Sequence, residues 1–190
     1  MKWRFEPGHS AAEFCARHMM VTWVRGSFKN VEGEIEFDPQ RPEELKVEAR
    51  IDARTCWTGE PNRDEHLRSA DFLHCESFPS IRFASTTVAQ IGPVDYEVGG
   101  ELTIRAVTRP VLLAVHYLGS WQTPWWEDGV DRGPKERAGF TATTSIDRYD
   151  FGVAWNGVLP DGGIVVSRRV EIVLDVEGIR CDPAAGSEEG

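Results

Sequence analysis

The sequence predicts an all-β domain whose antiparallel strands close into a barrel, with one short helix. Apolar and charged residues alternate without a break over residues 45–53, as expected of a strand with one buried face. Further stretches rich in β-branched and aromatic residues recur along the chain between turn residues. Closure into a barrel would hide the edges of so many strands, whereas a β-sandwich is the competing arrangement.

The sequence predicts nine strands. In chain order they span residues 13–17, 20–25, 31–37, 45–53, 81–88, 96–104, 111–117, 140–146 and 164–176. Gly26 and Gly33 mark bends between the first of them. In the last strand, Arg168 shares the apolar parity of Val166 and Val170. We therefore expect Arg168 either to meet an anionic group inside the barrel or to reach water at the rim.

Three segments depart from this rhythm. Residues 61–72 open with Pro and Asn, carry acidic residues early and predict a short helix. Residues 120–137 hold Trp121, Trp125 and Trp126 among Pro, Gly and Asp, and predict a long loop that caps a barrel mouth or packs on the outer wall. Residues 181–190 form a polar tail that we expect to be disordered, which leaves one domain over residues 1–180.

Composition excludes several classes of protein. The net charge of -10 argues against binding to nucleic acid or to an anionic membrane surface. Nothing in the chain approaches the roughly 20 consecutive apolar residues of a membrane span. The charged start predicts no signal peptide and thus a cytoplasmic protein. In that reducing compartment Cys15, Cys56, Cys75 and Cys181 are expected as free thiols.

The residues offer little for catalysis. The five histidines form no HxxxH or HExxH pair, and neither GxSxG nor a glycine-rich phosphate loop occurs. A metal-assisted hydrolase or isomerase would need His9, His18, His66 and Asp64 to meet across the fold. We predict instead a protein that is not an enzyme and has no cofactor and no metal.

A succession of short motifs runs from about Trp3 to about Gly178. They are Pro7-Gly8-His9-Ser10 with Phe14 and His18, Gly26-Ser27-Phe28, and the segments 33–38, 63–72, 78–86, 100–105, 108–111 and 148–152. Through this succession the chain resembles the YceI-like family of lipocalin-like, isoprenoid-binding proteins. It departs from the family pattern at Ala106, where glycine is usual, and in the longer segment 120–137.

The resemblance implies an extended eight-stranded antiparallel, lipocalin-like barrel that binds an apolar, isoprenoid-like lipid without catalysis, as a carrier or store. We expect the cavity to be lined by Phe14, Phe28, Ile51, Phe83, Leu102, Ile104, Phe140, Ile146 and Leu174. His18 and Arg168 are the candidate partners of a headgroup. The alternatives are an ordinary filled core, and a stress-linked interaction protein that docks through residues 120–137. An exposed barrel flank is compatible with a homodimer.

Overall fold

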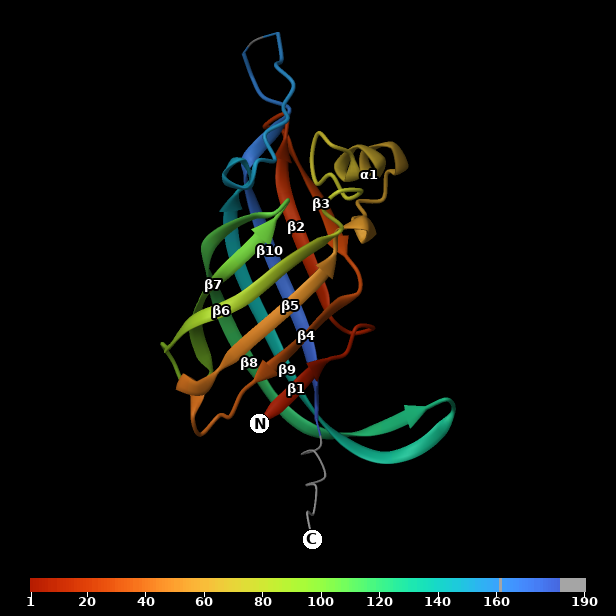
Figure 1. The fold of residues 1–190 in the computed structure, drawn as a ribbon, viewed down its shortest axis with the longest axis vertical. Helices are drawn as coiled ribbons and strands as arrows, with labels where there is room; N and C mark the ends of the chain where they lie inside the picture. Colours follow the sequence, from red (N-terminus) through yellow and green to blue (C-terminus); the bar gives the residue numbers. More distant parts are fainter. Residues whose placement is uncertain (161, 182–190) are drawn as a thin grey trace.

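The computed structural model describes residues 1–160 and 162–181. Within these residues the strands form one antiparallel sheet in the order β1-β4-β5-β6-β7-β8-β9-β10-β2-β3, and a further pairing of β1 with β10 closes it (Figure 1). The strands are β1 Lys2–Phe5, β2 Ala11–His18, β3 Thr22–Phe28, β4 Val31–Glu36, β5 Lys46–Asp52, β6 Ser80–Gln90, β7 Asp95–Ile104, β8 Val107–Glu127, β9 Val130–Asp147 and β10 Val166–Arg180. The helices are α1 Pro61–Arg68 and the 3₁₀ turns η1 Pro42–Glu44, η2 Ala53–Thr55 and η3 Arg148–Phe151.

The strands of the described chain fill eight barrel positions, because two positions are each built from two consecutive strands. Along one edge β10 pairs with β9, and along the other it pairs first with β2 and then with β1. In the same way, β3 pairs with β2 and β4 pairs with β1. The chain bends between β3 and β4 at Asn30, which takes a left-handed φ of 57°. The predicted eight-stranded antiparallel barrel with one short helix is confirmed.

The alternation of β5 explains how such a strand forms. Val47, Ala49 and Ile51 face the interior, whereas Glu48 and Arg50 are exposed. A strand places successive side chains on opposite faces, so this pattern buries every apolar residue at once. A slip of one residue would exchange the two faces, and the register is therefore strongly specified.

The prediction of a loop over residues 120–137 is wrong. The segment is the outer part of the β8–β9 hairpin, which continues past the barrel as a two-stranded arm (Figure 1). Pro124 and Pro134 stand opposite each other. Proline lacks an N–H group, but it is tolerated where no ladder hydrogen bond is needed, as on an edge. Trp121 and Trp126 are exposed on the arm, at 60% and 62%.

The sequence analysis also missed β1. Trp3 and Phe5 point inward between the exposed Lys2 and Arg4, but this alternation is too short to stand out. Of the predicted tail, Cys181 donates its backbone N–H to the carbonyl of Lys2. The remainder, residues 182–190, lies outside the described residues.

The barrel has two different ends, which we name by what they carry. The helix end carries α1, the β2–β3 turn and the segment 157–165, and the hairpin end carries the β8–β9 arm and the start of the chain (Figure 1). Near the hairpin end lies an aromatic plug. It consists of Trp3, Phe37, Tyr96, Tyr117 and Phe140.

Phe37 is the centre of the aromatic plug. Its ring centroid lies 5.7 Å from that of Tyr96, 4.9 Å from Tyr117 and 5.3 Å from Phe140. These are edge-on arrangements, which bring the positive edge of one ring to the negative face of another. Trp3 Nε1 donates to the Phe37 carbonyl at 3.2 Å, so the one polar atom of that buried indole is satisfied. The plug therefore closes this end of the interior.

We expect Phe37→Ala to lower the free energy of unfolding by about 3–5 kcal/mol, because it removes a fully buried ring and leaves a cavity among four others. Urea denaturation measures the change. Trp121→Ala, at an exposed aromatic site on the arm, should stay within about 0.5 kcal/mol of the wild type. Equal losses in the two variants would contradict the role assigned to the plug.

Candidate functional site

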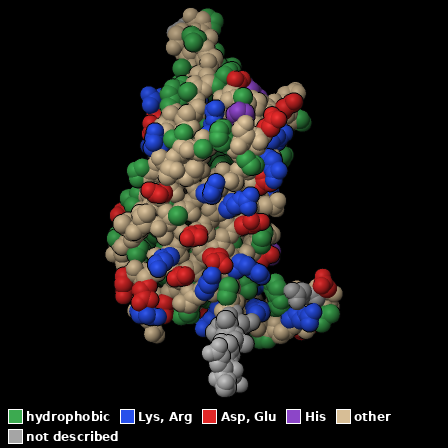
Figure 2. Space-filling view, in the orientation of Figure 1, with side chains coloured by type: hydrophobic (Ala, Val, Ile, Leu, Met, Phe, Trp, Pro, Cys, Tyr) green, Lys and Arg blue, Asp and Glu red, His purple; other side chains and the backbone are tan. Residues whose placement is uncertain are grey.

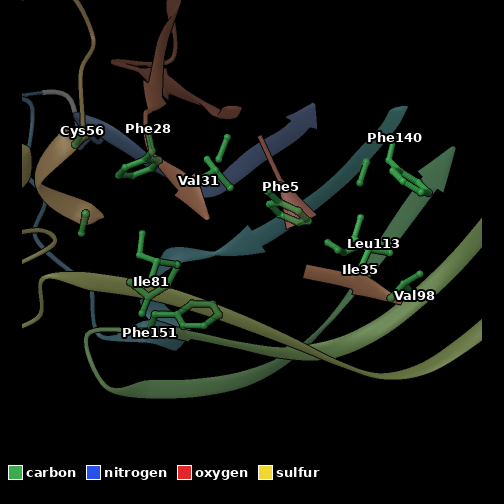
Figure 3. Packing of buried hydrophobic residues seen from close by; sticks show 14 of the residues in the cluster. Phe5, Phe28, Val31, Ile35, Cys56, Ile81, Val98, Leu113, Phe140 and Phe151 are labelled. Carbon is green, nitrogen blue, oxygen red and sulfur yellow. The ribbon is translucent and has the colours of Figure 1, made fainter. Parts of the chain in front are cut away.

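The barrel encloses a cavity of about 240 Å³. Its wall takes side chains from strands all around the barrel, and almost all of them are apolar. Figure 3 shows labelled side chains from several strands directed into this interior, among them Phe28, Ile81 and Phe140. The hairpin end of the cavity reaches Ile35, Val98 and Phe140 but not Phe37, so the plug forms its floor. The interior is thus not completely filled by its own side chains.

The structure places the predicted apolar residues together. All nine line the cavity: Phe14, Phe28, Ile51, Phe83, Leu102, Ile104, Phe140, Ile146 and Leu174. They come from seven strands, and their common orientation follows from the alternation within each strand. Whether they touch a ligand stays a prediction.

The two predicted polar partners are not on the wall. The inward parity assigned to Arg168 is wrong, because β10 bulges between Val166 and Val170 and alternation does not hold there. Arg168 is exposed, and its Nη2 pairs with Asp147 Oδ2 at 2.5 Å. This ion pair lowers the pKa of the Asp147 carboxyl, chiefly through the hydrogen bond. His18 is half-buried at the end of β2, beyond the last lining residue of that strand, Ala16.

Arg148 is a buried charged residue that sequence reasoning did not place on the wall. Its Nε donates to the Ser167 carbonyl at 2.9 Å and its Nη2 to the Val166 carbonyl at 3.1 Å. Its Nη1 donates to the carbonyls of Val153 and Trp155, at 2.6 and 2.8 Å. Burial lowers the pKa of this guanidinium.

A cap segment, residues 53–79, covers the helix end and contributes Cys56, Leu67, Phe72 and Leu73 to the wall. Glu60 caps α1 by accepting from the N–H groups of Asn62 and Arg63. The sequence signal for the helix of the cap segment was Pro61 at its start. The polar residues around Leu67 gave no sign that this side chain would face a cavity.

Polar contacts fix the cap segment to itself and to the barrel. Buried Asp64 accepts from the backbone N–H and the hydroxyl of Thr58, at 2.8 and 2.5 Å. Arg68 donates to the Cys56 carbonyl at 2.8 Å. Arg105 donates to the carbonyl of Phe72, and also to that of Gly152, at 2.9 Å each. These hydrogen bonds satisfy backbone N–H and carbonyl groups of irregular segments, which have no partner in a neighbouring strand.

The residues of the metal hypothesis do not converge. His66 Nε2 lies 2.9 Å from Asp71 Oδ2 and its ring packs on Trp155, whereas Asp64 binds Thr58. Over the described residues, the group with metal-ligating atoms close together is Glu6, His9 and Glu177. Glu177 also forms an ion pair with Arg137, and this ion pair would compete with a metal ion for the Glu177 carboxylate.

A closed antiparallel barrel with an apolar interior cavity defines a lipocalin-like β-barrel protein. The chain belongs to the YceI-like domain family, whose model matches residues 3–178. A UPF0312 protein of Shewanella baltica is 35% identical over 175 residues, covering 92% of this chain and 84% of the relative. A UPF0312 protein of Pseudomonas putida is 30% identical, with coverages of 92% and 83%.

Solved structures share the fold. BcnA of Burkholderia cenocepacia superposes with a TM-score of 0.74 at 20% identity, covering 91% of this chain and 98% of that one. A polyisoprenoid binding domain from Saccharophagus degradans gives 0.63 at 12% identity, with coverages of 94% and 98%. No helix in the described part of the chain has the length and apolar character to cross a membrane.

Burial raises the pKa of the Cys56 thiol to about 12. At pH 8 only about one thiol in ten thousand is then ionised, and the thiolate is the reactive form. We expect the native protein to leave Cys56 unmodified by a thiol reagent at pH 8, whereas the more exposed Cys15 reacts. Peptide mass spectrometry after timed alkylation measures both sites. Equally fast labelling of the two in folded protein would contradict the burial of Cys56.

Proposed function

We propose that this protein binds a slender apolar lipid of isoprenoid type inside its barrel and acts as a non-catalytic carrier or store. The observation that carries the proposal is the apolar cavity of about 240 Å³. This volume is slightly below the roughly 300–1,000 Å³ of sites for drug-sized ligands. A narrow hydrocarbon chain therefore suits it better than a bulky ring system.

The chemistry of the wall supports a ligand held by burial. Each Å² of apolar surface removed from water contributes about 25 cal/mol, so a branched hydrocarbon tail needs no polar contact to bind. Where the wall is polar, as at Arg148, the donors already have carbonyl partners. An apolar tail would thus leave no buried hydrogen-bonding group unsatisfied.

Arg148 supports an orientation for that ligand. It lies on the wall near the helix end, where its guanidinium is 5.8 Å from the Phe72 ring of the cap segment. Its positive charge would favour electronegative oxygen atoms nearby. We place the polar end of the ligand toward the helix end and the tail toward the aromatic plug. The description of the Saccharophagus degradans barrel as a polyisoprenoid binding domain is consistent with this class of ligand.

Native mass spectrometry tests the proposal directly. Protein freed of lipid is incubated with a polyprenyl alcohol of several isoprene units, and we expect one ligand bound per barrel. A linear alkane sulfonate of similar length serves as a comparison for headgroup preference. The proposal fails if neither the purified nor the incubated protein carries any apolar molecule.

We expect Phe83→Trp to weaken binding of the polyprenyl alcohol by roughly tenfold, because overpacking costs about 1–3 kcal/mol. The Phe83 ring already packs against β7, where a Cβ on Gly100 would meet its Cζ at 2.4 Å. The extra atoms of tryptophan must therefore turn into the cavity. Titration with a fluorescent polyprenyl analogue measures the dissociation constant.

Ala84→Trp is the matched control, because Ala84 is the next residue of β6 and is exposed on the outer face. Its affinity should stay at the wild-type value. Unchanged affinity in Phe83→Trp, with both variants folded, would show that the ligand does not occupy this part of the barrel.

A further inference from the structure

The helix end carries an apolar tip that no part of the described chain covers. It consists of Met20 and Val21 in the β2–β3 turn and of Val158 and Ile164 in the segment 157–165. Val21 is 80% exposed and Val158 84% exposed. The two segments are joined, because Met19 donates its backbone N–H to the Val165 carbonyl at 2.8 Å. Figure 2 shows green, hydrophobic side chains on the projecting segment at the top of the molecule.

The turn itself does not require these side chains. Met19 and Met20 take left-handed φ angles of 47° and 61°, a conformation that glycine or asparagine adopts at lower cost. Large apolar residues at such positions are unfavourable in two ways: they strain the turn, and they expose apolar surface to water. Strained backbone of this kind, held together with exposed apolar side chains, is typical of a surface with a binding role.

In sequence, the two segments that form the tip hold more basic than acidic residues. The two segments that form it, residues 17–25 and 157–165, contain Arg17 and Arg25 against one acidic residue, Asp161, although the net charge of the whole chain is -10. The Arg17 guanidinium lies 4.8 Å from the ring centroid of Trp23, which is partly exposed. Tryptophan and arginine next to apolar side chains match the layers of a bilayer surface, with headgroups outside and acyl chains inside.

The tip also adjoins the end of the cavity that lies opposite the aromatic plug. The wall at this end includes Ala16 and Val166, and Val166 pairs with His18 immediately before the β2–β3 turn. A lipid that leaves or enters the barrel here would pass next to the tip.

We infer that the helix end docks reversibly on a phospholipid bilayer. Met20, Val21, Val158 and Ile164 enter the acyl boundary, while Trp23, Arg17 and Arg25 lie at the headgroups. The inference rests on the proposed lipid-binding function, for which the docked barrel would exchange its ligand with the bilayer. The small apolar area makes the association weak, and the overall negative charge disfavours strongly anionic surfaces.

Flotation with vesicles of phosphatidylcholine containing a minor fraction of phosphatidylglycerol tests the inference. The wild-type protein should float with the vesicles. Val21→Asp and Val158→Asp should each lower the ratio of vesicle-bound to free protein by roughly tenfold, because each places a charge in the acyl boundary. Val130→Asp is the matched control: it introduces the same charge at a 51% exposed valine of the β8–β9 arm, and its binding should be unchanged.

Three results would overturn the inference. The first is no flotation of the wild type, and the second is an equal loss in all three variants. The third is a loss of self-association in Val21→Asp, measured by analytical ultracentrifugation, with vesicle binding intact, since the tip would then contact a second copy. Binding of the polyprenyl alcohol without vesicles is measured in parallel and should be the same in every variant. Ligand binding without flotation would refute the docking alone, and flotation without ligand binding would refute the proposed function alone.

Discussion

Both edges of β10 are paired along most of their length, and the closure of the barrel depends on this. β9 occupies one edge, and β2 followed by β1 occupies the other. Closure leaves no extended edge strand in the body of the barrel and directs every alternate side chain to one interior. Eight strands enclose a space that side chains can just fill or that can hold one small ligand. Here the apolar wall leaves a cavity.

The two ends of that interior are closed by different means. At the hairpin end, Phe37 and the rings packed around it close the interior. At the helix end, the cap segment and the residues after η3 are irregular, so their carbonyl groups lack strand partners. Arg68, Arg105 and Arg148 donate to those carbonyls and hold the irregular backbone in place.

Much of the wall was predictable because alternation is a local property. Ile51 and Leu174 each belong to runs in which every second residue is apolar, and such runs assign a face without any knowledge of the partner strand. The same reasoning failed for Arg168, where a bulge interrupts the alternation that parity assumes. It failed again at Pro124 and Pro134, which suggested a loop but stand opposite each other in the two-stranded arm. In both places the outcome depends on what the partner strand does.

The sequence by itself determined that the strands are half apolar and that the inward residues are large hydrophobic ones. Its motifs, through their resemblance to the YceI-like family, implied a lipocalin-like barrel. It determined the short helix as well, through the Pro61 start and the loss of alternation. Only the tertiary structure decided that Arg148 rather than Arg168 lines the cavity, that Phe37 closes one end and that the exposed valines of two distant turns form one tip. The physical reason is that side-chain alternation is set within a strand, whereas bulges, register and the meeting of turns are set by hydrogen bonds between residues far apart in the chain.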